Sequence, residues 1–514
     1  MKRSETSPKL SRQMAAFLLL TIVFVVPGLV LLSTTTGKAF LEDLQNFHLS
    51  MENSEENILL QNDDDSFDHP PPLQDKRDLQ QNEKMNIVFL YGDDWRFDSL
   101  GYVNPQVHTP NLDRLAKEGM LFTENAVTTS ICWISRACLA TGQHYARHET
   151  LNLGEPVPFY DYWNETLYGK LTEHNYFTGA VGKWQPGGLQ GHMFNVSTNY
   201  WGFHFDDQGN HITDMNERDA LDFLQNKRKN VNDSFALFVN FFSPHHWDGN
   251  PEQYLPQNKT KHLYQDGNIT FGPTCTDEYW KKLPPFFNDQ NDGRSRWRDR
   301  FDEPNKAQKM IKNYYRLISG VDMTCGKILD ELDRQNLTDN TLIIFTTDNG
   351  YYHSEHGLAD KWYAHQESIK VPLIIKDPRM RKDLIGTKND EFTLSIDLAP
   401  TMLTAAGSDI PKRMQGRDMS ILYTEESRKR TKQKWRRKWY YEYPGIPGNT
   451  GHIPVQALVR KDYKYIYWPT HNYTELFHLP TDHYEINDLA RNDTHTEILE
   501  KLRKQFLKAQ SKAK

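Results

Sequence analysis

The chain has 514 residues, which is long enough for one large domain and a smaller one, each with its own hydrophobic core. Its formal net charge of −7, with lysines and arginines scattered along most of the chain, does not favour a nucleic-acid-binding protein. Its four cysteines, Cys132, Cys138, Cys275 and Cys325, are too few for a disulfide-scaffolded protein.

The first 84 residues contain targeting signals. An uncharged apolar run at residues 14–32 follows a short basic segment and is long enough to cross a bilayer as a helix. Positive residues before the run place that side in the cytosol. We therefore expect residues 1–37 to form a tail and signal-anchor of a single-pass type II membrane protein of the Golgi or cell surface. Cleavage near residues 33–37, which would release a secreted protein, is the alternative.

Residues 38–84 are rich in charge and include Pro70-Pro71-Pro72, with too few apolar side chains to pack, so they are predicted to be a disordered acidic stem. The body that follows carries several Asn-x-Ser/Thr sequons, which beside an export signal indicate glycosylated surface loops. The sequon asparagines are Asn164, Asn195, Asn232, Asn258, Asn268, Asn336, Asn472 and Asn492.

The body begins with alternating strand and helix patterns. Apolar runs typical of buried parallel strands lie at residues 86–91, 234–242, 341–347 and 371–375. Helical patterns lie at residues 110–119, 214–225 and 307–334. This alternation predicts an α/β sandwich with a mostly parallel central sheet, in which ligands bind at the carboxyl ends of the strands. We expect this domain to occupy residues 85–407.

The remainder, residues 408–514, changes character. Strand-forming residues cluster at 439–443, 455–460, 463–468 and 476–479, and an amphipathic helix is predicted at 496–509. These elements predict a small C-terminal subdomain with an antiparallel sheet and one helix. A basic run at residues 427–439 is explained either as a solvated linker or as a subsite for a polyanionic sulfated glycan.

Carboxylates follow two of the predicted strands. Asp93-Asp94 comes directly after the first strand, and Asp348-Asn349 follows the strand at residues 341–347. Oxygen ligands from these distant parts of the chain can meet at one hard cation. Acidic residues at strand ends also serve as turn formers or helix caps, which is the alternative for each pair taken alone.

The segment at residues 129–143, TSICWISRACLATGQ, places Cys132 ahead of Ser135-Arg136 and a Thr-Gly pair. It resembles the signature of the type I sulfatases of the alkaline phosphatase superfamily, in which this cysteine is oxidised to formylglycine by the formylglycine-generating enzyme. Further motifs follow in the order expected of that family, most similar to its carbohydrate and glycosaminoglycan sulfatases. They are Gly182-Lys183-Trp184, Ser243-Pro244-His245, Asp348-Asn349-Gly350, Glu355-His356-Gly357 and Lys361.

The resemblance implies a site and a reaction. It implies a divalent cation, usually calcium in animal members, bound by Asp93, Asp94, Asp348, Asn349 and the modified Cys132. One hydroxyl of the formylglycine hydrate would attack sulfur, and collapse of the hydrate would then release sulfate. The resemblance assigns Arg136 to the nucleophile and metal region, and Lys183, His245 and Lys361 to the sulfate and leaving group, with His356 in a supporting position.

Two positions depart from the family pattern. Gln185 stands where the family often has a histidine that takes a proton, with His192 as a nearby candidate replacement, and Ile134 stands where Pro or Ala is usual. The predicted function is a sulfatase acting on a sulfated carbohydrate. A phosphoesterase of the same superfamily is one alternative, and a catalytically weak, glycan-binding relative is another.

Overall fold

The computed structural model describes residues 84–148, 151–152, 155–156, 163–183, 193–228, 230, 233–425 and 435–514. All of them lie in a compact unit that extends from Gln81 to Lys514. The predicted tail, signal-anchor and stem up to residue 83 lie outside the described residues, as do Asn232 and most of the basic run. The proposed division at residue 407 stays a prediction.

No helix in the described part of the chain combines the length and the apolar character needed to cross a membrane.

The centre of the fold is an eight-stranded sheet with the order β13-β2-β12-β9-β1-β8-β6-β7. β1 pairs in parallel with both β8 and β9, and β6 pairs in parallel with β7 and β8, whereas β12 runs antiparallel to β2 and β9. The predicted mostly parallel sheet is therefore confirmed. Its strands are β1 (Asn86–Gly92), β2 (Met120–Phe122), β6 (Phe177–Gly182), β7 (Val196–Thr198), β8 (Phe235–Asn240), β9 (Thr341–Thr347), β12 (Leu373–Lys376) and β13 (Thr387–Asn389).

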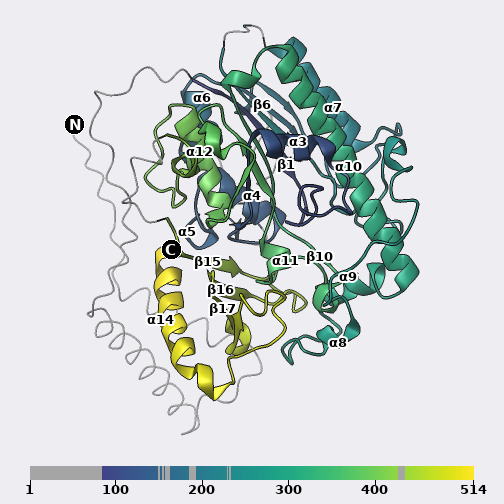
Figure 1. Cartoon of the computed structure of the whole chain (residues 1–514), viewed down its shortest axis with the longest axis vertical. Coiled ribbons are helices and arrows are strands. Elements are labelled where there is room, and N and C mark those ends of the chain that lie inside the picture. Colours follow the sequence, from purple (N-terminus) through teal and green to yellow (C-terminus); the bar gives the residue numbers. More distant parts are fainter. Residues whose placement is uncertain are drawn as a thin grey trace, which may run out of the picture. The chain divides into compact units, whose positions relative to one another are not determined.

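Helices cover both faces of this sheet (Figure 1). Alternate residues of β1 point to opposite faces, so Val88 and Leu90 enter one hydrophobic core, and Phe89 and Tyr91 enter the other. The first core is closed by α3 (Pro110–Glu118), α7 (Ile212–Asp222) and α10 (Pro304–Arg334). The second core is closed by α4 (Cys132–Thr141), α6 (Leu167–Glu173) and α12 (Leu398–Ala405).

Shorter elements complete the body around this sandwich. They are β3 (Asn125–Ala126), β4 (Leu151–Asn152), β5 (Glu155–Pro156), β10 (Tyr352–His353), β11 (Ala359–Asp360), β14 (Thr393–Leu394), α5 (Tyr145–His148), α8 (Asp277–Trp280), α9 (Asp292–Arg300) and α11 (Gln366–Ile369).

β6 is one of four strands of this sheet, with β2, β7 and β13, that the sequence analysis did not predict, and it is the one that leads into the candidate site. Its sequence, FTGAVG, contains two glycines, which are poor strand formers. Gly179 is nevertheless required, because a Cβ at this position would lie 2.4 Å from the ring of Phe223. The Phe223 ring lies so close to the strand that position 179 needs a glycine, although glycine weakens the sequence signal for a strand.

The C-terminal part forms a four-stranded antiparallel sheet with the order β15-β16-β17-β18, which confirms the predicted small sheet and helix. Tyr440 and Leu458 pack beneath the last helix, and Trp439 and Tyr441 enter the core of the body. Figure 1 shows this last helix, in yellow, beside β15, β16 and β17. The elements are β15 (Lys438–Tyr443), β16 (Val455–Arg460), β17 (Tyr463–Trp468), β18 (Tyr473–His478) and α14 (Thr496–Ala513).

Residues 435–439, the part of the basic run that the structure describes, include side chains packed against the body. Arg436 is buried and forms an ion pair with Asp397, and the indole N–H of Trp435 donates to the carbonyl of Phe392 at 2.6 Å. Trp439 is buried as well. These side chains hold β15 against the body, and both explanations of the basic run stay predictions because most of it lies outside the described residues.

Candidate active site

Four adjacent parallel strands deliver the predicted site residues to one edge of the sheet. The strands lie in the order β6-β8-β1-β9, and parallel strands end at the same edge. Lys183 directly follows β6, His245 lies shortly after β8, Asp93 follows β1 and Asp348 follows β9. The sequence analysis placed Asp93 and Asp348 at strand ends and linked Lys183 and His245 to them by motif. The strand order explains why all four meet.

Three buried carboxylates form the centre of this edge. One oxygen each from Asp93, Asp94 and Asp348 lies within 4.8 Å of the others. Asp93 Oδ1, Asp94 Oδ2 and Asn349 Oδ1 are buried oxygens without a hydrogen-bond partner in the described structure. Buried oxygens of this kind need a partner, and carboxylate and amide oxygens are the ligands that hard cations prefer. These four residues therefore fit a divalent cation.

Three buried cations pair with these carboxylates. Arg136 binds Asp348, with Nε 2.8 Å from Oδ2. Lys183 forms an ion pair with Asp93, and Lys361 forms one with Asp94. Three positive charges thus face three negative charges, which leaves the protein groups of the site close to neutral.

Burial and their mutual attraction shift the pKa values of Asp94 and Lys361. Burial raises the pKa of Asp94 to about 7, while Lys361 opposes the shift and Asp93 adds to it. Burial alone would lower the pKa of Lys361, but the carboxylate of Asp94 raises it well above its ordinary value. The ammonium form of Lys361 is therefore the stable one at neutral pH.

Cys132 is the first residue of α4 and is 8% exposed. The N-terminus of a helix carries partial positive charge, which favours a negative or electron-rich group at this position. Burial raises the pKa of the Cys132 thiol, and Lys183 and Lys361 oppose the shift. Both lysines therefore act electrostatically on Cys132. Cys132 and Arg136 lie on the same helix, α4, which places both of them at the site.

Gly182 makes the turn that presents Lys183. Its φ is +87°, and a Cβ at this position would lie 2.0 Å from the carbonyl oxygen of Asn240. The next amide, that of Lys183, donates to the same carbonyl at 2.9 Å. A glycine is therefore needed at the end of β6.

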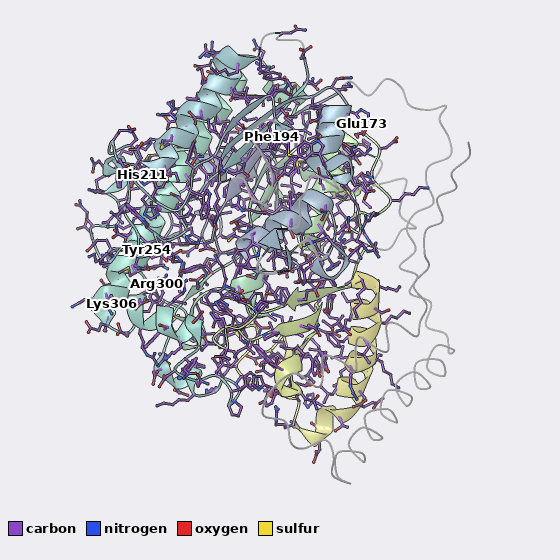
Figure 2. All side chains as sticks on the ribbon, turned by 180° about the vertical axis from the view of Figure 1, so that it is seen from behind. Glu173, Phe194, His211, Tyr254, Arg300 and Lys306 are labelled. Carbon is purple, nitrogen blue, oxygen red and sulfur yellow. The ribbon has the colours of Figure 1, made fainter. Side chains whose placement is uncertain are left out.

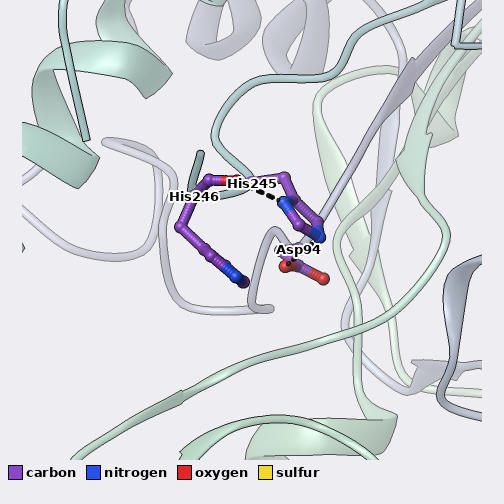
Figure 3. Close-up of side chains that lie close together, drawn as sticks. All are labelled: Asp94, His245 and His246. Atoms are coloured by element: carbon purple, nitrogen blue, oxygen red, sulfur yellow. Dashed lines mark hydrogen bonds and ion pairs between the residues drawn. The ribbon is translucent and has the colours of Figure 1, made fainter. Parts of the chain in front are cut away.

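His245 and His246 lie beside Asp94 (Figure 3). His245 Nε2 is 3.5 Å from Asp94 Oδ2, and its Nδ1 donates to the backbone oxygen of His246 at 2.6 Å. Burial, followed by Lys361 and Lys183, lowers the pKa of His245 well below its ordinary value, so the ring is neutral. Ligand atoms of Asp94, His245 and His246 also lie close together. This second group carries one negative charge, so the three carboxylates are better suited to a divalent cation.

Three other residues considered in the sequence analysis, His356, Gln185 and His192, are not among the groups described above. His356 is buried and stacks on His365, with ring centroids 4.5 Å apart. Its electrostatic neighbours are Glu355 and Lys464, and burial lowers its pKa to about 4. Gln185 and His192 fall in residues 184–192, outside the described part of the chain.

The sequence analysis missed two groups next to the site. Asp360, directly before Lys361, binds Arg296 and Arg300 of α9, with Nη1 to Oδ2 distances of 3.1 and 3.4 Å. Trp201 is 48% exposed, and Lys183 Nζ lies 6.0 Å from its ring centroid. The arginine-rich sequence of α9, DGRSRWRDR, was the available signal for the first group, whereas nothing marked Trp201.

Comparisons with known proteins agree with this geometry. The family model described as Sulfatase matches residues 85–408, and a model described as N-sulphoglucosamine sulphohydrolase, C-terminal, matches residues 354–512. The N-acetylglucosamine-6-O-sulfatase of Bacteroides thetaiotaomicron is 24% identical to this chain over 499 residues, which cover 83% of this chain and 88% of the relative.

Solved structures show the same fold. A protein solved in complex with its substrate D-glucosamine-2-N,6-O-disulfate is 22% identical, with a TM-score of 0.68, over 84% of this chain and 98% of that protein. The phosphonate monoester hydrolase of Agrobacterium radiobacter is 19% identical, with a TM-score of 0.66, over 84% of this chain and 96% of that protein. Since the sulfatase model covers more than half of the residues, the chain belongs to the sulfatase family and is a sulfuric ester hydrolase.

Proposed function

We propose that the protein hydrolyses a sulfate ester of a carbohydrate, with a formylglycine formed from Cys132 as nucleophile and one Ca²⁺ ion in the site. The observation that carries the proposal is the meeting of Cys132 with three carboxylates and three buried cations. The formylglycine-generating enzyme is the partner that this chemistry requires.

Asp93, Asp94, Asp348 and Asn349 would hold the cation, because three of them present buried oxygens without partners. When bound, the ion polarises the sulfate oxygens and offsets the negative charge of the ester. Arg136 orients Asp348 for this role through its contact at 2.8 Å. Lys183 and Lys361 would supply fixed positive charge to the sulfate, in place before the reaction begins.

Position 132 would present the nucleophile at the start of α4. Once converted, its hydrated aldehyde supplies a hydroxyl that attacks sulfur, together with the second hydroxyl that lets sulfate leave. Cys132 is buried among Lys183, Lys361, Asp93 and Asp348, so the reacting group meets little bulk water.

Lys361 and His245 would act on the leaving oxygen. Lys361 is an ammonium that can donate a hydrogen bond as negative charge develops on that oxygen. His245 holds its single proton on Nδ1, facing the carbonyl of His246. It can therefore protonate the leaving oxygen only as imidazolium, a form that the negative charge of a bound ester would favour.

A carbohydrate is favoured as the leaving group by Trp201. An exposed indole near Lys183 offers an apolar face for a sugar ring at the side of the site. The similarity to an N-acetylglucosamine-6-O-sulfatase and to a protein bound to a disulfated glucosamine supports the same substrate class.

We also propose that the protein follows the secretory route, by way of the N-terminal apolar run. All seven sequon asparagines in the described residues are exposed, as glycosylation requires. They are Asn164, Asn195, Asn258, Asn268, Asn336, Asn472 and Asn492.

The test combines mass spectrometry with turnover. The peptide containing Cys132 should carry the aldehyde, and the protein should hydrolyse 4-nitrophenyl sulfate faster than the phosphate or phenylphosphonate analogue. Cys132→Ser should abolish turnover. A fully unmodified thiol with no turnover would support the glycan-binding alternative, and a preference for the phosphorus esters would support the phosphoesterase alternative.

A further inference from the structure

The helix α9 carries four arginines in nine residues, and two of them contact Asp360, which directly precedes Lys361. These two, Arg296 and Arg300, are one helical turn apart and so share a face. Arg300 is fully buried and donates to the hydroxyl of Tyr351 at 2.7 Å and to the side chain of Gln253 at 2.9 Å. Tyr254, labelled with Arg300 in Figure 2, donates to the same Tyr351 hydroxyl. Arg300 is therefore an internal anchor of α9.

Arg296 differs from Arg300 because its side chain is 33% exposed. Its Nη1 lies 3.1 Å from Asp360 Oδ2 and 2.7 Å from His246 Nε2. Asp360 already has Arg300 at 3.4 Å, and Lys361 Nζ lies 3.8 Å from its other oxygen. All three cations lower the pKa of the buried Asp360, and Arg296 acts most strongly.

The contacts of Arg296 place it next to both groups that would act on the leaving oxygen. His246 stacks on His245 with ring centroids 4.4 Å apart, and Asp360 directly precedes Lys361. Arg296 is therefore one contact away from each of these two groups.

The free edge of Arg296 suits an anion. Its described polar contacts are made by Nη1, so Nε and Nη2 have no hydrogen-bond partner among the residues that the structure describes. These two N–H groups form the edge of the guanidinium that binds carboxylates and sulfates in a bidentate manner. The nearby carboxylate of Asp248 is 66% exposed and lies 3.2 Å from Nη1, so it shares the guanidinium with solvent.

We infer that Arg296 recognises a second anionic group on the substrate, a sulfate or carboxylate on the sugar that carries the scissile ester. The inference rests on the function proposed above and adds that the substrate is at least doubly anionic. In the free protein Asp248 pairs with the guanidinium of Arg296. A bound substrate anion then shares the positive charge of this guanidinium with Asp248. Arg296 is a specificity-determining residue that does not act on sulfur itself.

The first experiment compares substrates with and without the second anion. For D-glucosamine-2-N,6-O-disulfate, Arg296→Gln should raise KM about 10-fold to 100-fold with kcat little changed, the size expected for charged hydrogen bonds. For 4-nitrophenyl sulfate, which lacks the second anion, the same variant should raise KM far less than for the disulfate. Arg298→Gln is the matched control, because Arg298 lies on the same helix, is 41% exposed and pairs with Asp289. It should leave both substrates unchanged.

Two further variants distinguish recognition from a structural role. Arg296→Lys keeps the positive charge but loses the paired N–H donors of the guanidinium. It should therefore restore only part of the affinity for the disulfate. Asp248→Asn removes the negative charge that competes for Arg296 while keeping an oxygen acceptor for His246, so it should lower KM for the disulfate. Equal losses on both substrates, or no loss on the disulfate, would overturn the inference.

Binding of the same disulfate to Cys132→Ser protein, followed by calorimetry, measures recognition without turnover. Arg296→Gln added to this background should weaken Kd about 10-fold or more, whereas N-acetylglucosamine-6-sulfate should bind both proteins alike. If 4-nitrophenyl sulfate is not hydrolysed but this difference in Kd appears, the proposed catalytic function fails and the assignment of Arg296 stands. An unchanged Kd would refute the assignment even in an active sulfatase.

Discussion

Arg136 holds Asp348 through a single carboxylate oxygen: its Nε and Nη2 lie 2.8 and 2.7 Å from Oδ2. The other oxygen, Oδ1, accepts the backbone N–H of Asp94 at 3.3 Å. One side chain from α4 therefore fixes a carboxylate that follows β9, and this carboxylate in turn contacts the turn that follows β1.

Replacing Arg136 should destabilise the metal-free protein. Arg136→Gln leaves Asp348 buried without its charged partner, so the free energy of unfolding should fall by about 3–5 kcal/mol. Urea denaturation in the presence of a chelator measures the loss. Arg114→Gln removes an arginine from an exposed ion pair with Asp330 and should cost less than about 1 kcal/mol. Similar losses in the two variants would contradict the role given to Arg136.

Calcium should stabilise the protein. Chelator-treated protein should show a higher Tm when Ca²⁺ is added, because binding to the folded state alone shifts the unfolding equilibrium. Asp94→Asn should reduce the shift, since it removes a charged oxygen from the group formed with Asp93 and Asp348. Thermal unfolding with Ca²⁺ and with an equal ionic strength of Na⁺ measures the effect. An equal rise in Tm with both salts would rule out a specific ion site.

Ile134 should be a core residue rather than a reactive one. It is fully buried on α4, within the core that contains Phe89 and Tyr91. Ile134→Ala should lower the free energy of unfolding by roughly 2–5 kcal/mol, and Ile134→Val by about 1 kcal/mol, because each leaves a cavity of different size. Urea denaturation of the three proteins provides the comparison. A cost for the alanine variant below that of the valine variant would contradict this packing role.

Glu475 should make stability depend on pH. Burial raises its pKa to about 8, against the hydrogen bond that Trp468 Nε1 donates to it at 2.6 Å. Between pH 4.5 and about 8 the folded state therefore holds a proton that the unfolded state releases, so this group's contribution to stability falls as pH rises through that window.

Glu475→Gln keeps the acceptor for Trp468 and removes the titration. Asp488 and Glu485 also face this carboxyl group, as does the cation of Arg491. The difference in unfolding free energy between Glu475→Gln and the unmodified protein should therefore grow in favour of the variant from pH 5 to pH 8. Urea midpoints measured at several pH values provide the test, and a constant difference would show that Glu475 does not titrate in this range.

Long, strongly patterned elements were predictable from the sequence. The strand at residues 341–347 matches β9 at both ends, because seven consecutive strand-forming residues lie between turn residues. The predicted helix at 307–334 begins three residues earlier in the structure, at Pro304, since proline fits the first turn of a helix. The helix predicted at 214–225 ends as α7 at Asp222 and continues as a π-helical segment to Lys227.

The candidate site was only partly predictable. Motifs identified Cys132, Lys183 and Lys361, but β6, the strand that positions Lys183, was missed because its glycines carry no strand signal. Arg296 and Asp360 were missed for another reason. Their pairing depends on how α9 packs against the segment before Lys361, and contacts between distant segments leave no local pattern in the sequence.

The ion pair between Asp94 and Lys361 joins residues 267 positions apart, so the site closes late in biosynthesis. Cys132 is only 8% exposed once this has happened, and an enzyme cannot reach it there. During translation, Cys132 is made well before β9 and Lys361. The oxidation that the proposed chemistry needs must therefore be completed while the second half of the chain is still being made or is not yet folded. Conversion of Cys132 would then compete with folding of the chain.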